Sequence, residues 1–252
     1  MKRVLKVCLA SALFFLYRAI DPWCRFREVS ILAYHSISDA PLYTAVTPEV
    51  FRAHLSRLKA GGYSFVSLRD VIAFLDGSPL PKRAVALTFD DGYADFETTV
   101  LPILDQFEAP ATVFIVGDEA ASRSALGNAL PLLDQNALTR VRAHPRIEIG
   151  YHARTHANLR TLSGGALQDE VRTPFGARYF AYPGGNYSNE AVDAVRAAGY
   201  EAAFSIKPTH VRAASDHFLL PRFVITKDPV MRDILFYASR AAAWYRALTR
   251  FV

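Results

Sequence analysis

Short apolar runs recur along the chain from residue 29 to residue 225, and stretches with helical periodicity separate them. Several runs are apolar at almost every position, which is typical of strands buried on both faces of a parallel sheet. The predicted strands cover residues 29–34, 64–68, 84–89, 111–116, 147–150, 178–182, 202–206 and 223–225.

The intervals between these runs predict helices. Thr47 can cap a helix that has Pro48 at its first position, and Phe51, Leu55 and Leu58 then share one face. The other predicted helices cover residues 68–75, 96–107, 132–143 and 189–198. Alternating strands and helices predict an α/β fold with a parallel sheet, either open or closed into a barrel.

The domain organisation follows from length and composition. The chain has 252 residues and is 51% hydrophobic, which is enough for one sizeable core. We expect a single domain over residues 29–229, with an N-terminal segment of residues 1–28 and a C-terminal segment of residues 230–252 on either side of it.

The net charge of +5 is concentrated at the two ends. Residues 1–28 contain six basic and two acidic side chains, and residues 230–252 contain four arginines and one acid. The middle of the chain is therefore slightly acidic. This argues against nucleic acid as a partner and favours an anionic membrane surface as a partner of the two tails.

Both tails have patterns found at membranes. In the N-terminal segment, basic residues precede an apolar run of residues 7–17, which has the length of a signal-peptide core and is short for a membrane span. This predicts an anchor or a signal-like segment, and a protein that is membrane-associated or exported to the cell envelope, with the cytoplasmic membrane face not excluded. A helix packed on the domain is the alternative. The C-terminal arginines alternate with aromatic residues, as in an interfacial helix or in a helix that closes a barrel.

Two adjacent carboxylates, Asp90 and Asp91, follow the apolar run of residues 84–89. Functional groups gather at the C-terminal ends of parallel strands. Successive strand side chains point to opposite faces, so the two carboxylates converge only if the backbone bends, which the following Gly92 permits. A helix cap beside a surface residue is the structural alternative.

Two histidines, His152 and His156, follow the run of residues 147–150. Their spacing places both imidazoles on one side if the turn is helical. Two neutral imidazoles and one carboxylate make a three-ligand site with an open position, which is typical of catalytic zinc. Cobalt and nickel suit the same ligands.

A third cluster ends the predicted strand of residues 178–182, where the sequence reads YFAYPGG. A proline-glycine turn at such a place can bring the backbone close to a ligand.

The motifs TFDDG, HARTH and FAYPGG, in this order, resemble the polysaccharide deacetylase family, the NodB-homology domain of carbohydrate esterase family 4. The resemblance also covers ILAYHSISD and extends from residue 31 to about residue 225. It implies a distorted (β/α) barrel and a hydrolase that removes N-acetyl groups from a glycan of the N-acetylglucosamine type. It also implies a divalent metal, usually zinc.

The resemblance assigns roles to single residues. It matches Asp91, His152 and His156 to the metal ligands and Asp90 to the general base. The YHSIS stretch resembles the branch that deacetylates exported poly-N-acetylglucosamine, which implies His35 as the catalytic acid.

Other residues complete these expectations. His217 is the alternative acid, and His54 is expected at the surface of its helix. A backbone N–H near Tyr93 is expected to hold the oxyanion. The predicted substrate-binding residues are Tyr93, Tyr182, Pro183 and Gly184.

One position departs from the family pattern. Many relatives have an arginine in the third motif that orients the base, and this chain has Ala181 there. Asp90 then needs another partner, which the sequence does not identify. Two alternative functions stay open: a deacylase of a lipid-linked sugar at the membrane surface, and a glycan-binding pseudoenzyme.

Overall fold

The computed structural model describes residues 28–127, 130–173, 175–227, 234–239 and 241. Residues 1–27, which include almost all of the expected anchor, lie outside this part. So do the four arginines of the C-terminal segment, at positions 232, 240, 246 and 250. The membrane roles expected of the tails therefore stay predictions.

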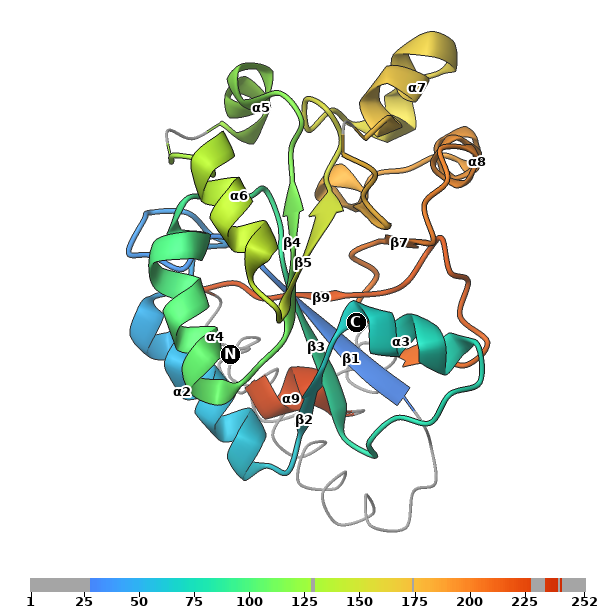
Figure 1. The fold of residues 1–252 in the computed structure, drawn as a ribbon. Helices are drawn as coiled ribbons and strands as arrows, with labels where there is room; N and C mark the ends of the chain where they lie inside the picture. The colour runs from blue at the N-terminus through green and yellow to red at the C-terminus, as the bar shows by residue number, and fades with distance from the viewer. Residues whose placement is uncertain (1–27, 128–129, 174, 228–233, 240, 242–252) are drawn as a thin grey trace, which may run out of the picture.

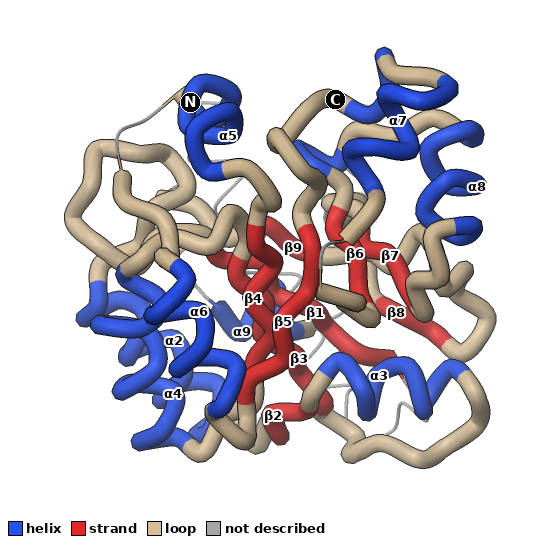
Figure 2. Tube along the Cα trace, turned by 45° about the horizontal axis from the view of Figure 1, so that its top comes forward, coloured by secondary structure: helices blue, strands red, loops and turns tan. Residues whose placement is uncertain are grey.

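A curled and mainly parallel sheet organises the described chain, with helices packed around it (Figure 1, Figure 2). Its strand order is β7-β6-β5-β4-β3-β1-β8, with β2 paired to β3 and β9 paired to β1. Only the β1–β8 pair is antiparallel within the described residues. The strands are β1 (Glu28–Tyr34), β2 (Ser64–Val66), β3 (Ala84–Phe89), β4 (Ala111–Ile115), β5 (Ile147–Tyr151), β6 (Tyr179–Ala181), β7 (Ala202–Phe204), β8 (Val211–Arg212) and β9 (Phe223–Val224).

The helices mostly begin where a polar side chain accepts a backbone N–H of the first turn. Thr47, Ser67 and Ser188 do this for α2, α3 and α8, and Asp118 and Asp134 do it for α5 and α6. The helices are α2 (Pro48–Ala60), α3 (Leu68–Leu75), α4 (Leu101–Phe107), α5 (Glu119–Leu126), α6 (Gln135–Ala143), α7 (Gly164–Val171), α8 (Asn189–Ala197) and α9 (Ile234–Ala238).

The stretch between β8 and β9 closes the sheet. The Ser205 N–H donates to the Leu220 carbonyl at 2.8 Å, and the Leu220 N–H donates to the Ala203 carbonyl at 2.9 Å. Three residues after Leu220, β9 begins and pairs with β1, with Phe223 opposite Leu32. The chain therefore connects β7 to β1 and completes a distorted barrel, which confirms the predicted fold class.

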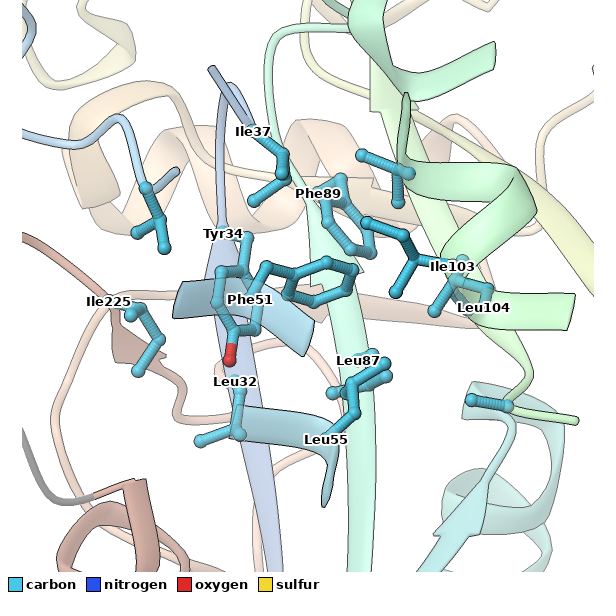
Figure 3. Packing of buried hydrophobic residues seen from close by; sticks show 14 of the residues in the cluster. Leu32, Tyr34, Ile37, Phe51, Leu55, Leu87, Phe89, Ile103, Leu104 and Ile225 are labelled. Atoms are coloured by element: carbon cyan, nitrogen blue, oxygen red, sulfur yellow. The ribbon is translucent and has the colours of Figure 1, made fainter. Parts of the chain in front are cut away.

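The main core lies between the sheet and helices α2 and α4 (Figure 3). Phe51 of α2 is fully buried and packs edge-on against Tyr34 of β1 and Phe89 of β3, with ring centroids 5.1 Å and 5.7 Å apart. Tyr34 and Phe89 are the last residues of their strands, so this core lies directly beneath the loops that follow them.

The helix α9 falls in the predicted C-terminal segment. Its Ile234, Phe236 and Tyr237 side chains are buried, and the Tyr237 ring lies 5.9 Å from the ring of Phe223. These residues pack as a barrel-closing helix would. Among the described residues, no helix is both long enough and apolar enough to cross a membrane.

Some local predictions were wrong. His54 is buried, with 8% exposure, and its Nδ1 lies 3.1 Å from the buried Tyr34 hydroxyl, which gives the imidazole a polar partner away from water. The helix predicted from residue 132 begins at Gln135, because the Asp134 side chain caps it by accepting the Ala137 N–H at 2.7 Å. Helices α5 and α7 and strand β8 were not predicted.

Candidate active site

The candidate site lies where strands β1, β3 and β5 end. The Asp90 N–H donates to the carbonyl of Tyr34 at 2.9 Å, so the ends of β1 and β3 lie side by side. The His152 N–H donates to the Ile115 carbonyl at 2.8 Å, which joins the end of β5 to β4. This is the edge of the sheet at which the sequence predicts functional groups.

The backbone bends sharply between the two carboxylates. Asp91 has φ 74°, a left-handed conformation that is unusual for a residue with a side chain, and Gly92 has the same φ. Gly92 is also packed closely, because a Cβ there would lie 3.0 Å from the Ile115 side chain. The bend predicted beside Gly92 is therefore present, and it gives Asp90 and Asp91 different neighbours.

Asp91, His152 and His156 converge. Asp91 Oδ1 lies 3.5 Å from His152 Nε2 and 3.4 Å from His156 Nε2, and one ligand atom from each residue lies within 4.8 Å of the others. Ligands held about 2.0–2.1 Å from a tetrahedral ion lie about 3.3–3.4 Å from one another. The spacing therefore fits a divalent cation, and these three residues could hold one.

The orientation of His152 also suits a metal ligand. Its Nδ1 lies 2.7 Å from the carbonyl oxygen of Ala181, which can only accept, so Nδ1 carries the proton and Nε2 keeps its lone pair toward Asp91. Burial lowers the pKa of His152 to about 4, despite the opposing effect of Asp90. The imidazole is therefore neutral near pH 7.

Asp91 is prepared as an anionic ligand. It is 4% exposed, and burial by itself opposes ionisation. The adjacent His156 imidazole and the charge of His35 outweigh burial and hold the pKa of Asp91 far below its usual range.

The residue that replaces the missing arginine of the third motif is Arg222, immediately before β9. Its Nη1 and Nη2 atoms donate to the two carboxylate oxygens of Asp90 at 2.6 Å and 2.8 Å. The guanidinium, which is 0% exposed, also donates to the Thr88 hydroxyl at 3.1 Å and to the Ser205 carbonyl at 3.2 Å. Such a planar fork fixes both the position and the rotation of a carboxylate.

This pair also sets the charge of Asp90. Burial raises the pKa of the Asp90 carboxyl, but the Arg222 charge and the Arg222 hydrogen bonds together bring it below its usual value. The sequence does hold a signal for Arg222, because it is the one charged residue within the apolar stretch FLLPRFVI. A charge in such a place needs a buried partner.

His35 lies at the same edge, directly after β1. Its charge contributes to the lowered pKa of both Asp90 and Asp91, and its Nδ1 is buried with no hydrogen-bond partner in the part of the chain that is described. The next residue is fixed, since the Ser36 hydroxyl donates to the Asp95 carboxylate. The structure thus brings His35 together with the two aspartates.

His217 has different neighbours. Its Nε2 lies 3.9 Å from Asp76, which follows the last residue of α3, and its backbone carbonyl accepts the Ala203 N–H. The structure does not bring its imidazole together with Asp90 or Asp91.

The expected substrate-binding residues differ in how far they are buried. Tyr182 is fully buried and its hydroxyl donates to the Phe218 carbonyl at 3.0 Å, so its ring belongs to the core. Tyr93 and Pro183 are also buried. Gly184 is exposed and has φ 57°. The third motif therefore presents backbone, and chiefly Gly184, at the surface.

A cavity of about 480 Å³ reaches Asp91 from the side of α6. Apolar and polar groups both line it, among them Ile115, Leu138, Thr139 and Phe175. This volume falls within the usual range of small-molecule sites, about 300–1,000 Å³. One of the candidate metal ligands, Asp91, therefore borders a space that can take a small ligand.

Comparison with known families gives one match that covers half of the chain. Residues 77–203 match the family model for polysaccharide deacetylase. This stretch includes Asp90, Asp91, His152 and His156, and it ends before Arg222.

The individual relatives have low sequence identity to this chain. The chain is 26% identical to poly-β-1,6-N-acetyl-D-glucosamine N-deacetylase of Escherichia coli, over 85% of this chain and 39% of that protein. It is 23% identical to the protein of the same name in Staphylococcus epidermidis, over 73% of this chain and 69% of the relative. The chain thus spans well under half the length of the Escherichia coli protein.

Among solved structures, the chain is similar to the deacetylase PplD of Streptococcus pyogenes in complex with acetate. The TM-score is 0.69 and the identity 24%, over 83% of this chain and 97% of that one. At this level of identity the match supports the fold.

Proposed function

Since the chain belongs to the polysaccharide deacetylase family, we propose that it hydrolyses the N-acetyl groups of an N-acetylglucosamine-type polysaccharide or oligosaccharide in a metal-dependent reaction. The observation that carries the proposal is the convergence of the buried Asp91 and His152 with the half-buried His156, beside an Asp90 carboxylate held by Arg222. The names of the relatives from Escherichia coli and Staphylococcus epidermidis support the choice of glycan.

The proposed ligands would hold a divalent cation, most often zinc in this family, which would polarise the amide carbonyl and acidify a water molecule. Asp90 accepts the proton of the attacking water. Its lowered pKa keeps it ionised, and the two bonds from Arg222 hold its oxygens in place. A backbone N–H near Tyr93 is the proposed donor to the developing oxyanion.

The leaving nitrogen needs a proton, because an amine does not depart as an anion. We assign this step to His35, whose position after β1 places it by both aspartates. His217 is the weaker candidate, since its imidazole faces Asp76.

Acetate release tests the proposal directly. Purified protein should release acetate from N-acetylglucosamine oligomers and lose this activity in a chelator, and zinc, cobalt or nickel should restore it. Asp90→Asn should keep the metal and lose about 10²–10⁴-fold in rate. Asp169→Asn, at an exposed position of α7, is the matched control and should behave as the unchanged protein. A fully active Asp90→Asn variant would remove Asp90 as the base.

The two alternative functions now have different support. The pseudoenzyme hypothesis rested on the missing arginine, and the Arg222–Asp90 pair removes that reason; glycan binding without acetate release would restore it. The lipid-linked substrate rests on tails that lie outside the described residues. Flotation of the full chain with anionic liposomes tests it, and a chain that stays in the soluble fraction contradicts it.

A further inference from the structure

The turn from His152 to His156 contains two non-glycine residues with left-handed backbone. Ala153 has φ 65° and His156 has φ 58°, although neither is a glycine. The turn is therefore not helical. These left-handed residues still bring the two imidazoles together, with their ring centroids 5.0 Å apart. Such conformations persist only where surrounding contacts fix them.

The first half of the turn is fixed by the end of β4. The carbonyl of Ile115 accepts the His152 N–H at 2.8 Å, and the Gly117 N–H donates to the Ala153 carbonyl at 3.0 Å. His152 is held further through its side chain, by the Ala181 carbonyl. These contacts do not reach the second histidine.

The second half is fixed by Glu170 of α7. This carboxylate is 4% exposed, and its two oxygens accept the Thr155 N–H at 2.9 Å and the Thr155 hydroxyl at 2.6 Å. Its backbone carbonyl also accepts the Arg154 N–H at 2.9 Å, and the Arg154 guanidinium lies 3.9 Å from the carboxylate. Thr155 directly precedes His156, so Glu170 restrains the backbone from which the second imidazole extends.

We propose that Glu170 is a positioning residue for the metal centre: by binding both polar groups of Thr155, it holds His156 in the left-handed conformation that directs its imidazole to Asp91. This inference rests on the proposed metal site and assigns part of its affinity to a side chain that does not touch the ion. Groups that orient metal ligands are typically worth about 10–100-fold in metal affinity.

Cobalt titration of the metal-free full chain, followed by visible absorbance, tests the inference without using activity. Glu170→Ala should weaken Co²⁺ binding by about 10–100-fold. Thr155→Val, which removes the hydroxyl but keeps the N–H, should have a smaller effect in the same direction. Glu201→Ala is the control, because it also removes a carboxylate with two 2.6 Å bonds, here to Arg178 at a separate place on the surface.

The possible outcomes distinguish a failure of this inference from a failure of the proposed metal site. If Glu170→Ala and Thr155→Val lower the melting temperature of the metal-free protein but bind Co²⁺ within twofold of the unchanged chain, Glu170 only supports the fold and the inference is wrong. If the unchanged chain binds no Co²⁺, the metal site and this inference both fail. Selective loss of affinity in both variants, but not in Glu201→Ala, supports the inference even where Glu170→Ala is less stable.

Discussion

Arg222 and Asp90 form a fully buried, two-bond ion pair between the stretch that closes the barrel and the end of β3. Their side chains are 0% and 3% exposed. In the family pattern an arginine of the third motif has this task, and here the third motif holds Ala181. The same contact with Asp90, the proposed base, is therefore made from the residue before β9, and the backbone carbonyl of Ala181 orients His152 instead.

Arg222→Lys should lower the deacetylation rate by about 10–100-fold while leaving the metal content unchanged. Lysine keeps the charge but has no planar fork, so the Asp90 carboxylate loses one fixed bond and its orientation. Acetate release and metal analysis on the same preparation measure both effects. Arg178→Lys, at an exposed pair with Glu201, is the control. Equal rates in the two variants would show that the fork is not needed.

His35→Ala should reduce the rate by about 10²-fold or more, and His217→Ala should leave it nearly unchanged. The reason is position, because of these two histidines only His35 lies by the two aspartates. Rates on N-acetylglucosamine oligomers and on an acetyl ester of a good leaving group should be compared. The ester leaving group needs little protonation, so His35→Ala should recover much of its rate there. The opposite ranking of the two variants would make His217 the acid.

His54 should make the fold less stable in acid. Burial, with a smaller effect of Arg57, lowers its pKa in the fold to about 4, from an ordinary value of 6.5. The unfolded chain therefore binds more protons between these values, so the contribution of His54 is complete above about pH 6.5 and is lost as the pH falls toward 4. The free energy of unfolding should fall by about 2 kcal/mol from this group between pH 7 and pH 5.

Urea unfolding of the unchanged chain and of His54→Asn at the two pH values isolates this contribution, since other titrating groups are common to both. The variant should show the smaller dependence on pH. Identical dependence in both proteins would mean that His54 titrates normally despite its contact with Tyr34.

Gly185→Ala should destabilise the turn of the third motif. Gly185 has φ 67°, and a Cβ there would lie 2.2 Å from the Ile206 side chain, so the cost combines backbone strain with a clash and should reach about 1–3 kcal/mol. Gly199→Ala is the control, because Gly199 also has positive φ, 86°, but nothing lies within 4 Å of its added Cβ. Equal losses of stability in the two variants would show that Ile206 does not restrict the turn.

Much of the fold was predictable because its strands are read from local patterns. The continuous apolar runs gave β1, β3 and β4 to within a residue or two at each end, and Thr47 with Pro48 marked the start of α2. The polar groups that follow β3 and β5 were found for the same reason, since a charged motif after a buried strand is visible in the sequence alone.

The missed features depend on contacts between distant parts of the chain. His54 is buried because a hydroxyl on β1 meets it, and no helical periodicity contains that information. Asp90 and Arg222 are 132 residues apart in sequence, and only closure of the sheet makes them neighbours. Glu170 resembles any other acid of an amphipathic helix until the turn that it holds is seen.

The stretch between β8 and β9, which closes the sheet, also determines the order in which the parts of the site come together. A ribosome releases Asp90, Asp91, His152 and His156 well before Arg222, so the proposed metal ligands exist while Asp90, the proposed base, still lacks its counter-ion. Burying a carboxylate without such a partner is strongly unfavourable. Docking of the last strand therefore completes the barrel and neutralises the Asp90 charge in one event, and a nascent chain that stops short of Arg222 gains neither.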